Sequence, residues 1–544
     1  MRAYAYGSGK IGCFVLLTLT LLLPSARAVN VVMQHNDLSR TGANTSETIL
    51  TPTNVATSFG QLFENPVDGQ IYAQPLYVQN LSISNGVHNV VFVCTENNSV
   101  YAFDADGAGV TYWVTNLGTP FNPSLISCGD LSPAVGITGT PVIDLTTGTL
   151  YVDTKLLAGS AHKLHALNIT TGQEKFGGPV TVTTSGFNTI YQHQRPGLLL
   201  LSNVVYVCFG SHCDHQPSGG TYHGYVLGYN ATNLTQQLYS FNTTPNGSQG
   251  AIWSGGMAPA VDTNGNIYVM TGNGSFDGPT NNDYSMSFIK LSPSLTVEDY
   301  ATPSDFASLS GADLDLGSGG PVLVPPHYVV GIGKTTTLYL ADINNMGHVG
   351  NFTQTFTAES SQDDTVGKSP VYWQGPTKQY LFLMHSGNPT KSYQFTGSSI
   401  NTAPLGTASY TIADRCGGIS LSANGNANGV LWEIDDDSNM RAYDAVNFPK
   451  LLWTGSVGSY VKMNCPTIAN GKVYVGTASD LYVFGLTNYL YMQAGTANPV
   501  LSWATGGKLL QSTNLPGAWI TNSTTSPYTI VPTNNQMFYR LSVP

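Results

Sequence analysis

Histidine, arginine and aspartate side chains gather in one stretch near the middle of the chain. Imidazole and carboxylate groups are common metal ligands, so this stretch could hold a metal ion. The residues concerned are His193, Arg195, His212, Asp214, His215 and His223. If the surrounding strand is regular, His212 and Asp214 share one face and His215 points to the other. We therefore do not expect all of these side chains to bind the same ion.

Three charged residues and one asparagine interrupt apolar or glycine-rich stretches further along the chain. Lys334 ends the sequence Val-Gly-Ile-Gly-Lys, and a lysine in a buried strand needs a partner for its charge. We predict that it pairs with Asp315, which lies with Asp313 just before Gly-Ser-Gly-Gly. The two carboxylates could instead cap turns or accept hydrogen bonds from backbone amides. Asn273 lies between two glycines, where asparagine is favoured because it tolerates positive φ.

The elements that must position these residues form a repeat. A turn with proline leads into an apolar strand, a Gly or Asn turn, a second strand and an aromatic strand. The copies begin at Pro75, Pro141, Pro196, Pro259, Pro321, Pro370, Ser420 and Pro466. Units of this size without helices between them favour a β-propeller over a β-helix or a sandwich. We predict an all-β fold with an eight-bladed, quinoprotein-like β-propeller over residues 59–490.

The two ends of the repeat array predict how the ring closes. The last copy stops at Leu486 after three strands. We predict that Phe59–Val67 completes the last blade, because an open ring would expose an unpaired strand edge. Residues 29–58 then form an N-terminal extension. The repeat is lost over residues 497–544, where we predict a small β appendage that leans on the propeller because it is too small to be stable alone.

Several repeats end in Ala-x-Asp followed by glycine and tryptophan. The copies are Ala102-Phe-Asp104 with Gly109 and Trp113, Ala166-Leu-Asn168 with Gly172 and Phe176, and Ala442-Tyr-Asp444 with Trp453. This motif resembles the tryptophan-docking repeat of the pyrroloquinoline quinone (PQQ) β-propellers, and the resemblance covers about residues 60–490. It implies that the tryptophan of one blade packs against the next. Because non-catalytic scaffold proteins of outer-membrane assembly share the motif, it implies the fold more strongly than the cofactor.

One stretch resembles the central blade of the PQQ alcohol dehydrogenases. It comprises Trp253-Ser-Gly-Gly-Met-Ala-Pro-Ala-Val-Asp262, Thr271-Gly-Asn-Gly274 and Asp283-Tyr-Ser-Met-Ser-Phe-Ile-Lys-Leu. The resemblance implies that Trp253 lies near the cofactor, that Asn273 binds Ca²⁺ and that Lys334 contacts the quinone. It also implies a catalytic base at Asp315 or Asp313. Calcium would polarise the quinone carbonyl, and the carboxylate could take the proton of an alcohol as hydride leaves.

Three features of those dehydrogenases are missing from the sequence. No two cysteines are adjacent, and no Cys-x-x-Cys-His motif is present to attach haem, so we expect no haem. Their acidic calcium ligand has no convincing counterpart either, because Glu174, which the second repeat offers, lies in a docking turn rather than near the channel. The whole chain is more similar to exported bacterial PQQ-repeat proteins of unassigned activity. The shared stretches are Gln34-His-Asn-Asp37, Gly136-Ile-Thr-Gly-Thr-Pro-Val-Ile-Asp144, Ser211-His-Cys-Asp214 and Leu314-Asp-Leu-Gly-Ser-Gly-Gly320.

Residues 1–28 have the pattern of a signal peptide. Arg2 and Lys10 precede an apolar run, Ile11–Leu23. The sequence Ala26-Arg-Ala28 follows this run and has the small residues of a cleavage site. The run is too short to span a bilayer. We therefore expect a secreted or periplasmic chain with no transmembrane segment.

Seven cysteines are present, and one of them, Cys13, lies in the predicted signal peptide. Cys94 and Cys208 lie within apolar strands and are expected to be buried thiols. Cys128 and Cys213 lie in turn-rich segments and are our candidates for a disulfide, which an oxidising compartment permits. Asn-x-Ser/Thr sequons also permit glycosylation in a eukaryotic secretory host.

Composition and charge narrow the possible partners. The formal net charge is −11 and only 9% of residues are charged, so we expect no nucleic-acid partner. One hypothesis is a monomeric binding or scaffold propeller that recognises a polysaccharide or a protein through exposed Tyr and Trp on its loops. The other is a PQQ- and calcium-dependent oxidoreductase acting on a small alcohol or sugar. In that case Asp315 is the base, Asn273 binds calcium and Lys334 contacts the quinone.

Overall fold

The structure is a computed structural model of the chain. It describes residues 30–214, 221–360, 370–412, 417–493, 498, 500–503, 507–513, 518–531 and 537–542. The predicted signal peptide and His215 lie outside these residues. Across the described ranges, no helix is both long and apolar enough to cross a membrane.

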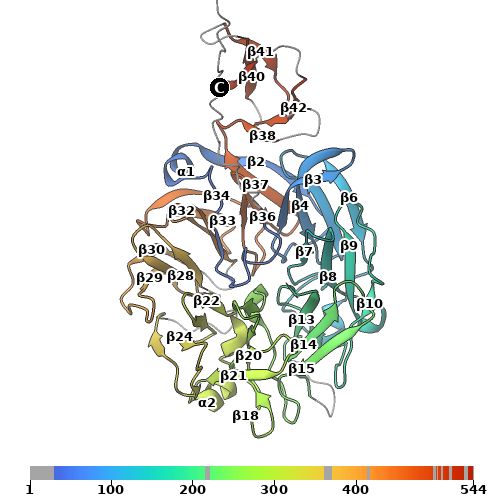
Figure 1. Cartoon of the computed structure of the whole chain (residues 1–544), viewed down its shortest axis with the longest axis vertical. Helices are drawn as coiled ribbons and strands as arrows, with labels where there is room; N and C mark the ends of the chain where they lie inside the picture. Colours follow the sequence, from blue (N-terminus) through green and yellow to red (C-terminus); the bar gives the residue numbers. More distant parts are fainter. Residues whose placement is uncertain are drawn as a thin grey trace, which may run out of the picture.

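The described chain is built mainly of strands, and its sheets stand in a ring (Figure 1). Over the described part of the propeller region, eight sheets have four or five strands each, and they follow the predicted repeats in chain order. The predicted all-β propeller is therefore confirmed. The connections contain α1 (Pro52–Ser58), α2 (Phe306–Gly311) and the 3-10 turns η1 (Pro123–Ile126), η2 (Ala158–Ser160), η3 (Ser254–Gly256) and η4 (Leu316–Ser318).

The first four sheets come from residues 76–302, with one strand, β25 (His348–Val349), added from later in the chain. Their strands are β3 (Leu76–Ile83), β4 (Gly86–Cys94), β5 (Ser99–Asp104) and β6 (Thr111–Asn116); β7 (Val142–Asp144), β8 (Thr149–Lys155), β9 (His162–Asn168) and β10 (Val180–Thr181); β11 (Gln192–His193), β12 (Leu199–Leu201), β13 (Val204–Ser211), β14 (Tyr225–Asn230) and β15 (Gln237–Asn242); and β16 (Ala260–Val261), β17 (Ile267–Met270), β20 (Phe288–Leu291), β21 (Val297–Thr302) and β25 (His348–Val349). A separate hairpin pairs β18 (Phe276–Gly278) with β19 (Asp283–Tyr284).

The next four sheets complete the ring and take in two N-terminal strands. Their strands are β22 (Val322–Val324), β23 (Tyr328–Ile332), β24 (Thr337–Asp342) and β26 (Gln354–Thr357); β27 (Val371–Gln374), β28 (Gln379–Leu383), β29 (Pro389–Phe395) and β30 (Gly406–Thr411); β1 (Ala43–Asn44), β31 (Ile419–Asn424), β32 (Ala427–Ile434), β33 (Asn439–Asp444) and β34 (Leu451–Ser456); and β2 (Phe59–Pro66), β35 (Thr467–Ala469), β36 (Lys472–Gly476) and β37 (Asp480–Leu486).

Strand burial depends on position within a sheet. β8 and β13 are buried along their whole length, because neighbouring sheets cover both of their faces. The outer strands β6 and β34 are partly exposed. On β6, the Trp113 indole donates to Ile169 O at 2.9 Å and lies against Gly172 of the next sheet, where a Cβ would come within 2.6 Å of the ring. The expected docking of a tryptophan on the next blade is confirmed here.

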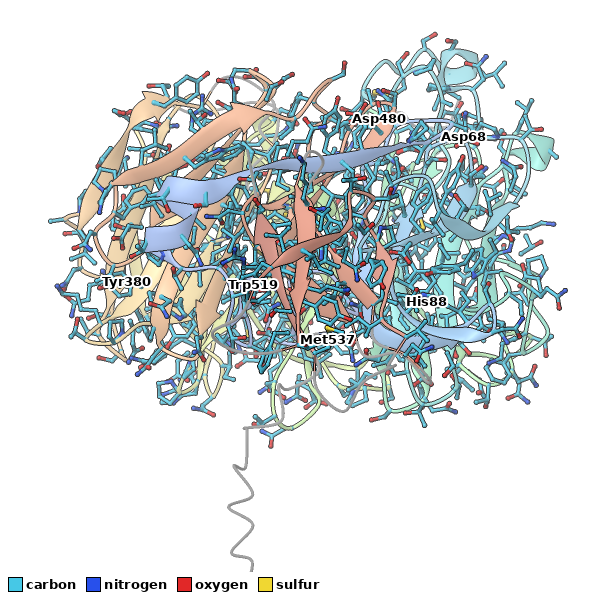
Figure 2. All side chains as sticks on the ribbon, turned by 90° about the horizontal axis from the view of Figure 1, so that it is seen from above. Asp68, His88, Tyr380, Asp480, Trp519 and Met537 are labelled. Carbon is cyan, nitrogen blue, oxygen red and sulfur yellow. A yellow bond between two sulfur atoms is a disulfide. The ribbon has the colours of Figure 1, made fainter. Side chains whose placement is uncertain are left out.

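The ring closes where the sequence predicted. β2 runs antiparallel to β37, from Phe59 opposite Leu486 to Pro66 opposite Asp480. In Figure 2, Asp68 and Asp480 accordingly lie close together at this junction. The Phe59 ring also packs 4.9 Å from that of Trp432. Closure therefore joins the two ends of the array by both backbone pairing and a shared apolar core.

Residues 31–47, which we call the belt, run inside the ring (Figure 1). The first strand of each sheet has an inner edge whose backbone groups need partners. The belt supplies them in order around the ring: the N–H groups of Tyr77, Ile143, Val261, Leu323, Tyr372 and Leu421 donate to the carbonyls of Val31, Val32, Leu38, Ser39, Thr41 and Gly42 at 2.7–2.9 Å. No sequence pattern predicted this role for the N-terminal extension.

Two three-stranded sheets follow the propeller and lie outside the ring beside β2 (Figure 1). They contain β38 (Tyr491–Gln493), β39 (Val500–Ser502) and β42 (Tyr528–Thr529), and β40 (Lys508–Ser512), β41 (Ile520–Ser523) and β43 (Phe538–Ser542). They begin at Tyr491, before the predicted start at Ala497. The Tyr491 hydroxyl accepts from Leu486 N–H at 2.8 Å and donates to Gly471 O at 3.1 Å, which fastens the appendage to the last sheet.

Candidate functional site

The lysine and the two aspartates singled out in the sequence lie together. Lys334 Nζ is 2.8 Å from Asp315 Oδ2 and 3.1 Å from Asp313 Oδ2. The predicted Lys334–Asp315 pair is confirmed. The sequence suggested that Lys334 lies within a strand. In the structure it lies two residues beyond the end of β23. Its backbone N–H donates to Asp315 O at 3.0 Å, which holds the two segments side by side.

Asn273 joins the same cluster from the turn after β17. Its backbone N–H donates to Asp315 Oδ1 at 2.7 Å, and its Nδ2 donates to Asp313 Oδ1 at 2.6 Å. Each of the four carboxylate oxygens therefore accepts from Asn273 or lies within ion-pair distance of Lys334. In contrast, Asn273 Oδ1 is buried and accepts no hydrogen bond from the described residues.

Trp253 lies against this cluster, just before η3. A Cβ at Gly272 would stand 2.2 Å from Asp315 Oδ1 and 3.0 Å from Trp253 Cδ1, so the carboxylate and the indole both approach this glycine. The indole nitrogen of Trp253 is buried and has no hydrogen-bond partner among the described residues. We call Trp253, Asn273, Asp313, Asp315 and Lys334 the axial site.

An ion-pair bridge places this cluster near the axis of the ring. Asp130 pairs with Arg195, which precedes β12, and with Lys462, which precedes β35. The sheets that contain β12 and β35 are separated by the first two sheets, so the shared carboxylate bridges distant parts of the ring. The Arg195 guanidinium carbon lies 5.2 Å from the centre of the Trp253 ring, which links the bridge to the axial site.

The polar cluster around residue 200 differs from the regular strand assumed for it. β13 ends at Ser211, and Cys213 and Asp214 have φ of 52° and 53°, so the chain turns where alternation along a face was expected. The rings of His193 and His212 stack with centroids 4.3 Å apart, and burial first, then their positive neighbours, lowers the pKa of both. His223 Nδ1 lies 3.0 Å from Thr244 Oγ1. In the described ranges, no group of three or more His, Cys, Asp or Glu side chains is arranged to hold a metal.

Asp214 interacts electrostatically with the axial site, although the sequence did not connect Asp214 with that site. Burial raises the pKa of Asp315 to about 6; the Lys334 ammonium opposes this shift and the Asp214 carboxylate adds to it. Burial also raises the pKa of Asp214, which accepts a hydrogen bond from Tyr222 and feels the charges of Asp313 and Lys334. Burial lowers the pKa of Lys334, but the two carboxylates outweigh it and the net shift is upward.

Four cysteines take the states that the sequence predicted for them. Cys128 and Cys213 form a disulfide. Cys94 and Cys208 are buried thiols, as predicted.

Glu174 Oε1 lies 2.5 Å from His165 Nδ1, within the docking turn of the second sheet and away from the axial site. It is therefore no counterpart of an acidic calcium ligand.

A binding function through the loops would use Tyr and Trp side chains that are exposed at the surface. Trp113, Trp453 and Trp519 are half-buried, and Trp253, Trp373, Trp432 and Trp503 are buried. None of these indoles is therefore fully exposed, whereas the Tyr489 side chain is 37% exposed.

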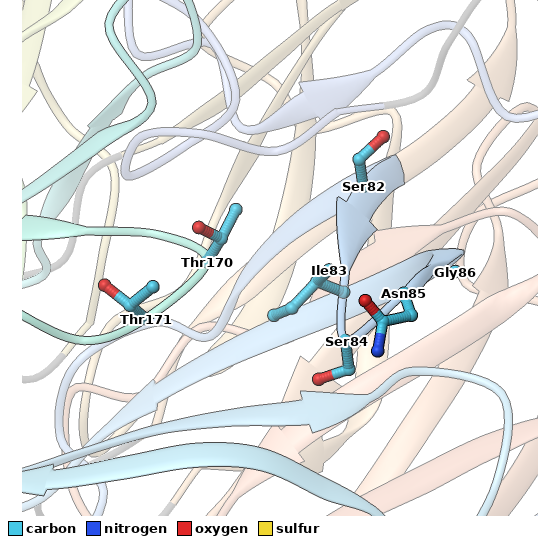
Figure 3. Close-up of a pocket in the computed structure, with 7 residues that line it drawn as sticks. All are labelled: Ser82, Ile83, Ser84, Asn85, Gly86, Thr170 and Thr171. Atoms are coloured by element: carbon cyan, nitrogen blue, oxygen red, sulfur yellow. The ribbon is translucent and has the colours of Figure 1, made fainter.

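A surface pocket of about 420 Å³ lies between the first two sheets (Figure 3). Its lining consists of Ser82, Ile83, Ser84, Asn85, Gly86, Thr170 and Thr171. These side chains carry no charge and no strong nucleophile. The pocket has no residue in common with the axial site.

The fold can be compared with known proteins. No family model matches the chain, and no curated protein matches it in sequence. Among solved structures, it is similar to the quinohemoprotein alcohol dehydrogenase from Comamonas testosteroni, with a TM-score of 0.60 and 14% identity over 84% of this chain and 80% of that chain. The computationally designed Ika8 protein (TM-score 0.47, 12% identity, 78% and 100% covered) and Sqt1 from Saccharomyces cerevisiae (0.47, 11%, 79% and 100%) are also similar. The first likeness shows that this chain has a β-propeller fold resembling that of a quinoprotein dehydrogenase.

Proposed function

We propose that this chain binds PQQ and calcium in the axial site and oxidises an alcohol or a sugar. One observation carries the proposal: four separate segments bring Trp253, Asn273, Asp313, Asp315 and Lys334 into one cluster, in which all but Asp313 are buried. Asp315 is 2% exposed, so its carboxylate is shielded from bulk water, whereas Asp313 lies at the solvent-exposed side of the cluster.

The donor set fits such a ligand. Calcium takes hard oxygen ligands. Asn273 Oδ1 is a buried oxygen that accepts no hydrogen bond from the described residues, and the Asp315 carboxylate lies beside it. A planar anionic quinone suits the flat Trp253 ring and the cations Lys334 and Arg195. When bound, PQQ would supply a two-electron acceptor for hydride, and calcium would supply a Lewis acid.

The residues of the chain would then hold and move a proton. Asp315 is our candidate for the catalytic base, because a pKa of about 6 leaves its carboxylate ionised at neutral pH yet able to accept the proton of a substrate hydroxyl. Asn273 N–H fixes Oδ1 of this carboxylate and Lys334 fixes Oδ2. Asp313 holds the other side of the Lys334 ammonium.

A binding or scaffold protein without catalysis is the second candidate. This candidate is favoured because all four carboxylate oxygens of Asp313 and Asp315 already have a partner in Asn273 or Lys334. In that case Lys334 has only a structural role as the shared ion-pair partner of the two aspartates, and a polysaccharide or protein would bind elsewhere. Under either function we propose a monomeric, secreted or periplasmic protein, which the signal-like segment and the disulfide support.

The experiment is reconstitution of the purified chain with PQQ and CaCl₂. A ligand that binds only the native state must raise the unfolding temperature. We expect this shift, together with reduction of an artificial electron acceptor by members of an alcohol and sugar panel. Asp315→Asn should lower the rate by about 10²–10⁴-fold, the usual contribution of a general base. Asp342→Asn, which removes the partner of His327 on a distant sheet edge, is the matched control.

The outcomes separate the two candidates. A thermal shift with dye reduction that is lost in Asp315→Asn but kept in Asp342→Asn supports the oxidoreductase. Neither a shift nor dye reduction would leave the binding or scaffold function.

A further inference from the structure

Residues 120–135, which we call the strap, form a closed lobe between β6 and β7. Phe121 and Val135 exchange both of their backbone hydrogen bonds, each at 2.9 Å, so the two ends of the lobe are joined. Several residues between them, including Ser124 and Gly129, face solvent, and the Leu125 side chain is 64% exposed. The strap is therefore a compact surface loop with one narrow neck.

Three kinds of attachment hold the lobe over the middle of the ring. The Cys128–Cys213 disulfide ties it to the end of β13. The Asp130 carboxylate pairs with Arg195 and Lys462. Leu131 is buried in an apolar cluster whose other members are Tyr72, Phe121, Val135, Val461 and Met463. The strap thus spans from the first two sheets to the third and the last.

The groups beneath the strap lead to the axial site. Arg195, which Asp130 contacts, lies over the Trp253 ring, and the Phe121 ring stacks 5.6 Å from that of His212. Arg195 and Trp253 are 6% and 7% exposed, so a ligand reaches this side of the axial site only after a covering segment moves, whereas the Asp313 side chain is 59% exposed and faces solvent. The belt pairs further along the inner strands and contacts the Trp253 turn through Gln34, whose Oε1 accepts from Ala258 N–H at 3.0 Å.

We propose that the strap is a lid and that the Cys128–Cys213 disulfide is its latch: a small molecule reaches the axial site while the disulfide is open and is retained once it forms. The proposal rests on the proposed function in one respect, that the axial site takes a ligand. Opening is a thiol–disulfide exchange with a small dithiol. The protein disulfide gains two electrons and two protons and becomes two thiols, and the dithiol is oxidised to its own disulfide.

The disulfide is the attachment that a change of conditions can cut. Burial would raise the pKa of Asp130, but Arg195 and Lys462 outweigh it and hold the pKa well below its usual range. Acidification to the usual pKa of an aspartate therefore does not neutralise the Asp130 carboxylate. A disulfide, in contrast, forms after export and is absent in a reducing compartment. In an oxidising compartment the two thiols would pass two electrons and two protons to an external disulfide, which is reduced to two thiols, and the latch would close.

The test compares the full-length chain in its oxidised and dithiol-reduced forms by hydrogen–deuterium exchange. Alkylation and mass measurement verify that the bond is cut. We expect amides of residues 122–134 to exchange at least 10-fold faster after reduction, with β4 and β13 unchanged. Cys128→Ser/Cys213→Ser should show the fast exchange without reductant. Cys94→Ala, which removes a buried thiol outside the strap, should keep the slow exchange of the oxidised chain.

Access to the site is measured without any cofactor, by iodide quenching of the Trp253 contribution to fluorescence. This contribution is the difference between the chain and Trp253→Phe, and we expect its quenching constant to rise at least 3-fold on reduction. Unchanged exchange and quenching with both thiols alkylated would overturn the lid. Faster exchange throughout the sheets would overturn it too, because the disulfide would then hold the whole fold.

PQQ uptake is followed separately in both forms. Uptake at least 10-fold faster in the reduced chain, and retention through dialysis after reoxidation, support the latch. Equal uptake rates in the two forms would overturn it. If PQQ binds neither form, the proposed function fails, and the exchange and quenching measurements still decide whether the lid opens.

Discussion

Replacing Lys334 by methionine tests whether the axial site is held together by its charges. The substitution keeps the length of the side chain but removes the ammonium that lies 2.8 Å from Asp315 Oδ2 and 3.1 Å from Asp313 Oδ2. Removing one partner of a buried pair typically lowers the free energy of unfolding by about 3–5 kcal/mol. Asp315 is 2% exposed, so this range applies to its side of the pair. Asp313 is more exposed and should contribute little.

The loss should depend on pH. The pKa of Asp315 is already raised to about 6, and without the ammonium it should rise further. A carboxyl whose pKa is raised in the folded state stabilises the fold at low pH, and this contribution is lost as pH rises through the folded pKa. We therefore expect Lys334→Met to lose about 3–5 kcal/mol at pH 8 and only about 1 kcal/mol at pH 5, where Asp315 can bind a proton.

The assay is denaturant unfolding at pH 5 and pH 8. Lys290→Met is the matched control, because the Lys290 ammonium donates to Ile343 O at 2.9 Å and leaves no carboxylate unpaired when removed. Lys334→Met/Asp315→Asn should recover at least about 2 kcal/mol relative to the single variant at pH 8, as expected for coupled neighbours. A loss below about 1 kcal/mol at both pH values, or no recovery in the double variant, would refute the reasoning.

Three further changes test the fold around the site. Glu433 is fully buried with its pKa raised to about 7, so its protonated form stabilises the fold at low pH and the contribution is lost as pH rises through 7. The free energy of unfolding should fall between pH 5 and pH 8, and in Glu433→Gln this fall should be smaller by up to about 3 kcal/mol. The same pH profile in the variant and the unmodified chain would contradict this. Phe59→Ala opens a cavity at the ring closure and should cost about 3–5 kcal/mol in denaturant melts; a loss below about 1 kcal/mol would show that closure does not depend on this core. Gly272→Ala would bring a Cβ within 2.2 Å of Asp315 Oδ1 and should cost about 1–3 kcal/mol, whereas Gly311→Ala, whose Cβ meets open space, should leave the melt unchanged.

Much of the architecture could be predicted because it repeats. The proline-led strand units specify one sheet after another, and Phe59–Val67 was identified as the closing strand because the last unit lacked one. The Lys334–Asp315 pair was predictable for a different reason. A lysine surrounded by apolar residues requires a counter-charge, and an aspartate in a glycine-rich segment was available.

Other parts of the site had no signal in the sequence. Asp130 meets Arg195 and Lys462 only because the strap crosses the ring, and Asp214 reaches the axial site because positive φ at Cys213 and Asp214 turns the chain out of β13. The belt is similar: its carbonyls pair with six different sheets, and any polar sequence of the right length could supply carbonyls. Such contacts join residues far apart in the chain and follow no period.

The amino-acid sequence by itself determined the repeating strands, their closure into a ring and the need of Lys334 for a carboxylate. These features depend on alternation, turn residues and the cost of an unpaired buried charge, which are properties of short segments. The tertiary structure alone decided that the belt fills the inner edges, that the strap lies over Arg195 and that Asn273 Oδ1 is left without a partner among the described residues. Those features arise only when the sheets stand around one axis and bring distant loops within hydrogen-bonding distance.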